Sequence, residues 1–234
     1  MPEPKLLAFD TSTDVLSVAV RHGDRIVAHS GVGGAQASST LIPLIRRLLA
    51  EAGLTLAALD AIAFGRGPGS FTGLRTACAV AQGLGFGAGV PLLPIDTLQA
   101  VADEARHRFG AVRIVALLDA RMDQVYAARY AFDGEDAPMA LPELLAPEQV
   151  AVPDGWALAG NAFAAYGERL RGGTARHAVL PTAEALLRLA PALLAAGGAV
   201  APADAWPLYV RDKVAQTTEE RAALKAAAAS AATL

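Results

Sequence analysis

The sequence has few of the residues that form disulfide bonds or bind metal ions. It has one cysteine and four histidines among 234 residues. A single cysteine excludes an internal disulfide, and a structural zinc site needs a cluster of cysteines and histidines that this chain lacks. We therefore expect an apolar core to hold the fold together, and a chain of this length is long enough to build one.

Charge is also scarce. Charged residues make up 18% of the chain, against roughly 25% in ordinary soluble domains, while hydrophobic residues make up 53%. A surface with so few charges either uses small residues or is covered by a partner. The formal net charge of −3 argues against an autonomous nucleic-acid-binding protein, because such proteins are basic.

Hydrophobic runs of the secretory or membrane-spanning kind are missing too. Only a four-residue apolar run separates Lys5 from Asp10, which does not fit a signal peptide. Residues 76–95 form a run without charge, but four glycines and two prolines interrupt it. This run therefore predicts a buried helix followed by a strand. We expect a cytoplasmic protein that does not associate with membranes.

The first third of the chain has the pattern of an α/β unit. Turns at 11–14 and 23–24 separate apolar runs and predict an antiparallel meander of strands. A helix capped by Ser38 or Ser39 and ended by Gly53 should follow. The remaining expected elements are a strand at 61–64, a helix after Ser70, a strand at 91–95 and a helix at 98–108 capped by Thr97.

The second half starts the same pattern again. Residues 113–119 (RIVALLD) resemble residues 5–10 (KLLAFD), and a second aspartate follows four positions later in both halves. Such a repeat is typical of a duplicated two-lobed fold, although any two buried strands that enter turns look alike. We expect a first lobe at 1–108, a second, reduced lobe at 109–210, and a C-terminal helix or tail at 211–234.

The rest of the second half has a weaker pattern. Strands are expected at 141–145 and 156–159, and a short helical turn at 147–150. Helices are expected at 161–170 and 182–196. A capping box between Thr217 and Glu220 predicts the start of a helix in the alanine-rich tail.

Three clusters contain residues that could carry chemistry. The first is a turn rich in hydroxyl groups after the first strand. Its hydroxyls and backbone N–H groups could hold a phosphate, with a carboxylate organising magnesium, or could simply satisfy the backbone of a hairpin. As weak nucleotide-binding candidates we name Asp10, Thr11, Ser12 and Thr13, together with Asp119 from the second half.

The second cluster is a glycine-rich loop between a strand and a helix. Free N–H groups at a helix N-terminus can bind an anion, but no Gly-Lys-Ser/Thr follows, so the loop is not a P-loop. The glycines could equally allow close backbone packing, and the aromatic residue favours a contact surface. The residues of this loop are Gly67, Pro68, Gly69, Ser70, Phe71, Thr72 and Gly73.

The third cluster is residues 119–126, where Arg121 between two aspartates indicates a structural ion pair. Nucleophilic catalysis has little support, because Cys78 falls in a helix of small residues and predicts a packing role. The four histidines are scattered, so we expect no metal site.

Four segments resemble one known family. They are LAFDTST at 7–13, FGRGPGSFTGLR at 64–75, LLDARMDQVY at 117–126 and PLYVRDKVA at 207–215. In this order they are similar to the bacterial TsaB (YeaZ) family of threonylcarbamoyladenosine-biosynthesis proteins. The resemblance implies a two-lobed α/β fold of the actin, sugar-kinase and heat-shock ATPase (ASKHA) superfamily, with duplicated βββαβα-type lobes and mixed sheets.

The resemblance also implies a function without catalysis. Family members are related to TsaD, which transfers threonylcarbamoyl to the adenosine beside the tRNA anticodon and holds a metal through a His-x-x-x-His motif. The comparable helix start here, residues 36–40, has no histidine. We therefore expect no cofactor in this chain, with any ATP or ADP and magnesium held mainly at the partner subunit. An ATP-dependent transferase or kinase is the alternative, and a peptidase a more distant one.

The implied partners are TsaD and TsaE, with tRNA reached only through the complex and a homodimer formed when the protein is alone. The first-lobe helices, around 41–52 and 72–87, are implied to form the interface. Its candidate residues are Leu41, Pro43, Leu44, Leu48, Arg75, Ala79 and Gln82.

Overall fold

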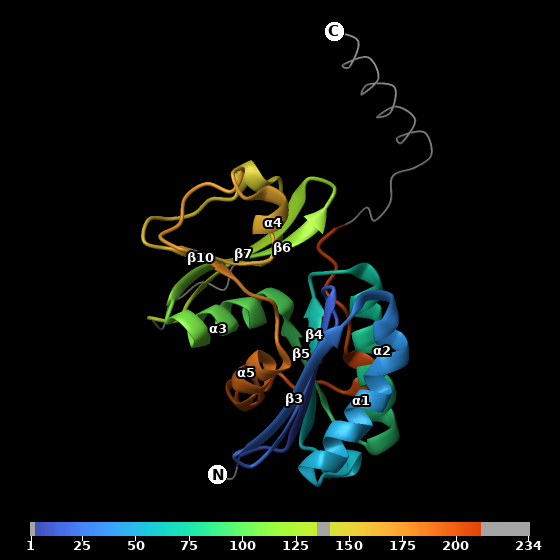
Figure 1. Cartoon of the computed structure of the whole chain (residues 1–234). Coiled ribbons are helices and arrows are strands. Elements are labelled where there is room, and N and C mark those ends of the chain that lie inside the picture. The colour runs from blue at the N-terminus through green and yellow to red at the C-terminus, as the bar shows by residue number, and fades with distance from the viewer. Residues whose placement is uncertain (1–2, 135–140, 212–234) are drawn as a thin grey trace, which may run out of the picture.

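The computed structural model describes residues 3–134 and 141–211, which form two lobes that each contain one five-stranded mixed sheet (Figure 1). The predicted C-terminal tail, with its capping box at Thr217, lies outside these residues. Within them, no helix is long and apolar enough to cross a membrane. Residues 76–95 form the end of one helix and the following strand, as their glycines and prolines predicted.

The first sheet has the strand order β3-β2-β1-β4-β5. β1 pairs antiparallel with β2 and parallel with β4, so the first three strands form the predicted meander. The elements of this half are β1 (Leu6–Asp10), β2 (Val15–His22), β3 (Arg25–Val32), η1 (Gly34–Gln36), α1 (Ala37–Ala52), η2 (Leu56–Ala58), β4 (Ala61–Gly67), α2 (Phe71–Ala88), β5 (Leu92–Asp96) and α3 (Thr97–Phe109).

The second sheet has the order β10-β9-β6-β7-β8. β6 pairs antiparallel with β7 and parallel with β9, which repeats the pairing of β1 in the first sheet. The duplication predicted from RIVALLD and KLLAFD is therefore confirmed. The elements are β6 (Arg113–Arg121), β7 (Gln124–Ala131), β8 (Glu143–Leu145), η3 (Pro147–Gln149), β9 (Ala157–Gly160), α4 (Phe163–Tyr166), β10 (Arg176–Ala178), α5 (Ala183–Ala195) and η4 (Pro202–Asp204).

The last helix of each half packs on the sheet of the other half. α3 follows β5, yet its residues Leu98, Val101 and Ala105 pack with β6 and β7. α5 follows β10, yet Leu186 and Leu187 pack with β1, β4 and β5. The lobe boundaries at 108 and 210 stay a prediction, because they follow chain order and these two helices pack across it. In three dimensions α3 packs on the second sheet and, through Ala100, also on the first, whereas α5 packs on the first sheet.

A buried ion-pair network joins these two exchanged helices. The guanidinium of Arg188 on α5 donates to Asp103 at 2.6 Å and to Glu104 at 2.7 Å, both on α3. The hydroxyl of Thr182 donates to Glu104 at 2.9 Å and also caps α5 by accepting from the backbone N–H of Ala185. Both carboxylates are buried and paired, so the contact holds the lobes together at their junction.

Several predicted helix ends were wrong. The N-cap of α1 is Gln36, not Ser38 or Ser39, and the N-cap of α3 is Asp96, not Thr97. The Thr97 hydroxyl is engaged elsewhere, because it accepts from the backbone N–H of Gly67 and donates to Asp10. By contrast, Gly53 ends α1 in the left-handed conformation, as predicted.

The helix expected at 161–170 shrinks to the single turn of α4. Gly167 follows that turn, and the guanidinium of Arg176 donates to the carbonyls of Gly167 and Leu170, which therefore need no helical partner. Arg176 opens β10, a strand of three residues that the sequence reading missed.

The exchange of α5 is tested by shortening Leu186, which is fully buried against the first sheet. We expect Leu186→Ala to lower the free energy of unfolding by about 2–5 kcal/mol in urea titrations. The control Leu141→Ala, at an 81% exposed side chain, should change it by less than about 0.5 kcal/mol. A loss below about 1 kcal/mol for Leu186→Ala would contradict this packing.

Candidate functional site

The turn after β1 is packed full by the protein itself. Asp10 and Thr11 are fully buried and Ser12 nearly so. One carboxylate oxygen of Asp10 accepts from the backbone N–H of Ser12 at 2.8 Å and from its hydroxyl at 2.5 Å. The other accepts from the hydroxyl of Thr97 at 3.3 Å. The polar atoms of Asp10 thus have partners within the protein.

The glycine-rich loop covers this turn. A Cβ atom at Gly65 would lie 1.8 Å from an Asp10 carboxylate oxygen, and one at Gly73 would lie 1.9 Å from the Thr11 carbonyl oxygen. The Thr11 hydroxyl donates to the Gly73 carbonyl at 2.7 Å. The glycines are therefore needed for close backbone packing, which was one of the two readings that the sequence left open.

Burial dominates the electrostatics of this turn. Desolvation raises the pKa of Asp10, although its hydrogen bonds from Ser12 and Thr97 act in the opposite direction. A phosphate or magnesium ion would need free carboxylate or N–H groups and space beside them. Asp10 and Thr11 are bonded within the protein instead, and the role of these two residues in nucleotide binding stays a prediction.

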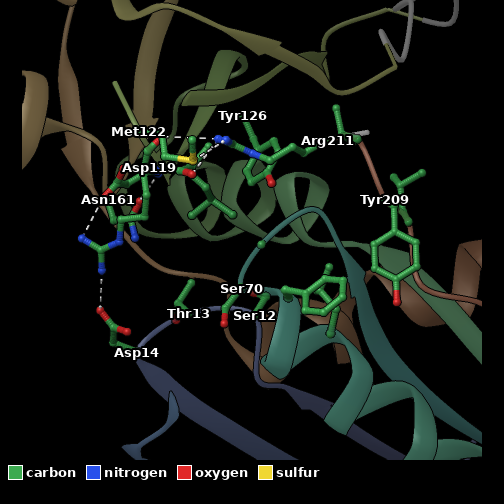
Figure 2. Close-up of a pocket in the computed structure, with 18 residues that line it drawn as sticks. Ser12, Thr13, Asp14, Ser70, Asp119, Met122, Tyr126, Asn161, Tyr209 and Arg211 are labelled. Atoms are coloured by element: carbon green, nitrogen blue, oxygen red, sulfur yellow. Dashed lines mark hydrogen bonds and ion pairs between the residues drawn. The ribbon is translucent and has the colours of Figure 1, made fainter. Parts of the chain in front are cut away.

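A cleft of about 330 Å³ opens between the lobes beside this turn. In Figure 2 the first-lobe residues Ser12, Thr13 and Ser70 lie on one side, and Asp119, Met122 and Tyr126 of the second lobe on the other. The segment after η4 forms a third wall with Tyr209 and Arg211. The structure thus brings Ser12, Thr13, Asp119 and the Gly69–Phe71 part of the loop to one cleft.

The second-lobe rim of the cleft is a strained turn. Arg121, Met122 and Asp123 all have positive φ, between 55° and 60°, although none is a glycine. The Asp119 carboxylate accepts from the backbone N–H of Arg121 at 2.7 Å, and Arg211 donates to the carbonyls of Ala120 and Arg121. These bonds hold the unfavourable backbone in place.

Ion pairs at the rim join the two lobes. Arg121 lies 3.0 Å from Asp119, as its position between two acids predicted, and 3.3 Å from Asp14 in the first lobe. The Asp14 pair is exposed on both sides, so it contributes little to stability. Asp119 itself also accepts from the Tyr166 hydroxyl at 3.0 Å, which leaves it tied to its own lobe.

Aromatic and cationic side chains form the first-lobe mouth of the cleft. The Phe71 and Tyr209 rings lie 5.8 Å apart, and the Arg75 guanidinium lies 3.8 Å from the Phe71 ring centre. Arg75 also donates to the Tyr209 hydroxyl at 3.2 Å. The contact surface predicted for Phe71 therefore includes a C-terminal residue that sequence reasoning missed. The PLYVR segment, which carries Tyr209 and Arg211, was the signal that could have identified them.

Metal ligands do not gather in the part of the chain that the structure describes. No group of three or more His, Cys, Asp or Glu residues there could hold an ion. Cys78 is buried, as its predicted packing role requires, and its thiol contacts the Ala205 carbonyl at 3.3 Å. Burial raises the pKa of the Cys78 thiol, which disfavours the thiolate.

Known proteins are similar in sequence to this chain over most of its length. A family model described as "TsaD: tRNA N6-adenosine threonylcarbamoyltransferase" matches residues 29–169. The tRNA threonylcarbamoyladenosine biosynthesis protein TsaB of Escherichia coli is 35% identical over 225 residues, which cover 90% of this chain and 96% of that protein. The chain belongs to the TsaB (YeaZ) family.

A second curated relative and a solved structure support the same family assignment. TsaB of Haemophilus influenzae is 45% identical over 121 residues, which cover 52% of this chain and 51% of that protein. The solved structure of YeaZ from Pseudomonas aeruginosa is 43% identical, has a TM-score of 0.82, and covers 88% of this chain and 99% of that chain. The two-lobed ASKHA-like fold implied by the resemblance is thereby confirmed.

The residues predicted for the partner interface of this TsaB-family chain differ in their exposure. Leu41, Leu44 and Leu48 lie in the core beneath α1, with at most 8% of each exposed, so their side chains have almost no surface to offer a partner. Pro43, Arg75 and Ala79 are exposed. Gln82 is half-buried because its side-chain amide donates to the Ala205 carbonyl at 3.0 Å.

Two glycines of α2 test the packing of the loop on the turn. Gly73→Ala should lower the free energy of unfolding by about 3 kcal/mol, because its Cβ would meet the Thr11 backbone. Gly83→Ala on the same helix meets nothing within 4 Å and should stabilise the protein by about 0.5–1 kcal/mol. Urea titrations measure both values, and equal effects would contradict the close contact.

The buried Asp10 carboxylate predicts a pH dependence. Its pKa is raised in the folded state, so the folded state holds the proton more tightly than the unfolded chain. The unfolding free energy of the native protein, relative to Asp10→Asn, should therefore fall as pH rises through the folded pKa. Denaturant titrations of both proteins from acid to neutral pH measure this difference. A difference that stayed constant with pH would contradict the raised pKa.

Proposed function

We propose that this chain is a non-catalytic subunit that binds TsaD and, with TsaE, supports threonylcarbamoyl transfer to the adenosine beside the tRNA anticodon. The observation that carries the proposal is the filled turn. Asp10 is buried under Gly65 and bonded to Ser12 and Thr97, and Asp14, the first-lobe carboxylate that lines the cleft, is paired with Arg121. A subunit without an available catalytic carboxylate acts through its surface.

The second-lobe carboxylate supports the same reading. Asp119 is occupied by the backbone N–H and guanidinium of Arg121 and by the Tyr166 hydroxyl. A phosphoryl-transfer enzyme needs a carboxylate free to organise magnesium and a cation free to face the phosphates. Arg211, the other cation of the cleft, donates to the carbonyls of Ala120 and Arg121.

The outer face of α2 is the surface that we assign to TsaD. Arg75, Ala79, Gly83 and Phe86 recur at spacings of three and four residues, so they share one face of the helix, and all four are exposed. Small residues allow a partner helix to approach closely, and Phe86, 64% exposed, offers the aromatic anchor of an interface. The same face would serve a homodimer when TsaD is absent.

Introducing a negative charge on the outer face of α2 tests whether this face binds TsaD. Ala79→Glu and Phe86→Glu should each weaken the complex with TsaD by at least about 30-fold, because a charge would be buried where an anchor packs. The control Val112→Glu, at a 45% exposed position of the second lobe, should leave binding unchanged. Isothermal titration with purified TsaD measures the affinities, and wild-type binding by both α2 variants would reject this surface.

A complementation experiment in cells tests whether the protein acts without catalysis. A strain depleted of the native protein should lose threonylcarbamoyladenosine from its tRNA, and Asp10→Asn should restore it, because the side-chain amide has the shape of the carboxylate that it replaces in the turn. Asp10 acting on magnesium would instead give a variant that fails to restore the modification. Sustained ATP hydrolysis by the purified protein, abolished by Asp10→Asn, would favour the transferase or kinase alternative.

A further inference from the structure

The four edge strands of the two sheets differ in length and in whether another segment covers them. The free side of β5 is bonded to Val200 by reciprocal backbone hydrogen bonds of 3.0 and 2.8 Å with Leu92. β8 and β10, at the edges of the second sheet, have three residues each. Short or covered edges are the usual protection against unwanted strand pairing.

β3 has none of these protections. It is an edge strand of eight residues, and it pairs with β2 over its whole length without a register shift. Its sequence, RIVAHSGV, contains no lysine, proline or acidic residue. Ile26 is 44% exposed and Val32 71% exposed. β3 stands at one end of the strand order of the first sheet, so its outer side pairs with no other strand of the described residues and is available to an added strand.

A groove runs beside this edge, between β3 and α1. Its volume is about 460 Å³. His29 and Gly31 contribute from β3, because they lie opposite Val18 and Leu16 on the sheet face that packs on α1. Pro43 and Arg47 contribute from α1. A strand added to β3 would therefore direct every second side chain into this groove.

The groove is positive. Arg47 is its one formally charged lining residue, and no carboxylate lines it. Arg25, at the start of the edge, is exposed as well. Within residues 3–134 and 141–211, neither arginine has a carboxylate within ion-pair distance. The pattern is that of a site for a carboxylate carried by an extended chain.

We propose that the free edge of β3 binds an extended, acidic segment of a partner protein as an added strand, with its acidic side chains directed into the groove toward Arg47. Backbone hydrogen bonds to β3 supply affinity, and the groove selects the side chains. A second copy of this chain is a poorer occupant, because pairing β3 with itself brings His29 and Arg25 toward Arg47 and no acid. This site is separate from the α2 surface assigned to TsaD.

Two synthetic octapeptides test the proposal, one alternating valine with glutamate and one alternating valine with lysine. The glutamate peptide should bind the full-length protein in fluorescence anisotropy and slow hydrogen exchange of the β3 amides. Arg47→Glu should weaken that binding at least tenfold and transfer the preference to the lysine peptide. The matched control Arg46→Glu, at an exposed arginine of α1 outside the groove, should bind as the native protein does.

Three outcomes would overturn the proposal. The first is equal binding of both peptides to the native protein. The second is binding of the glutamate peptide that leaves exchange of the β3 amides unchanged. The third is a dimer that protects β3 without any peptide and dissociates in Ala28→Lys, because the occupant would then be a second copy.

Discussion

The fold depends on one close contact, in which the loop after β4 lies directly on the turn after β1. Asp10 is buried there without a counter-charge, and hydrogen bonds from Ser12 and Thr97 offset part of the cost. The contact is possible only because Gly65 and Gly73 have no side chain. It places the N-terminus of α2, and with it Phe71 and Arg75, at the mouth of the cleft.

The packing of α3 and α5 between the two halves of the chain holds the elements around this contact in place. α5 packs on the first sheet, α3 packs on both sheets, and the Arg188 network joins one helix to the other. The lobes are thus joined by packing, by buried ion pairs, and by the C-terminal segment that carries Tyr209 and Arg211 to the cleft. For a subunit proposed to act through its surface, such a frame keeps the outer face of α2 in a fixed position.

Much of the fold could be predicted because strong local patterns determine it. The apolar runs of β1 and β6 each follow a basic residue, Lys5 or Arg113, and lead into an aspartate, and this shared pattern revealed the duplication. β10 was missed because its three residues, Arg176–Ala178, have no apolar alternation. The candidate site was predicted only in part, since a sequence shows that Asp10 and Gly73 are unusual but not that they fill each other's space.

The sequence by itself determined the strands, the two-fold repeat, the family and the glycine-rich loop, because periodicity and short motifs are local properties of the chain. Only the tertiary structure decided which helix covers which sheet, because both sheets offer similar apolar faces. It also placed Leu41, Leu44 and Leu48 in the core and left the α2 face and the β3 edge open. Some of the uncharged residues of this chain thus lie on buried helix faces and others on exposed apolar surface. Only the packing in the tertiary structure shows which residue is which.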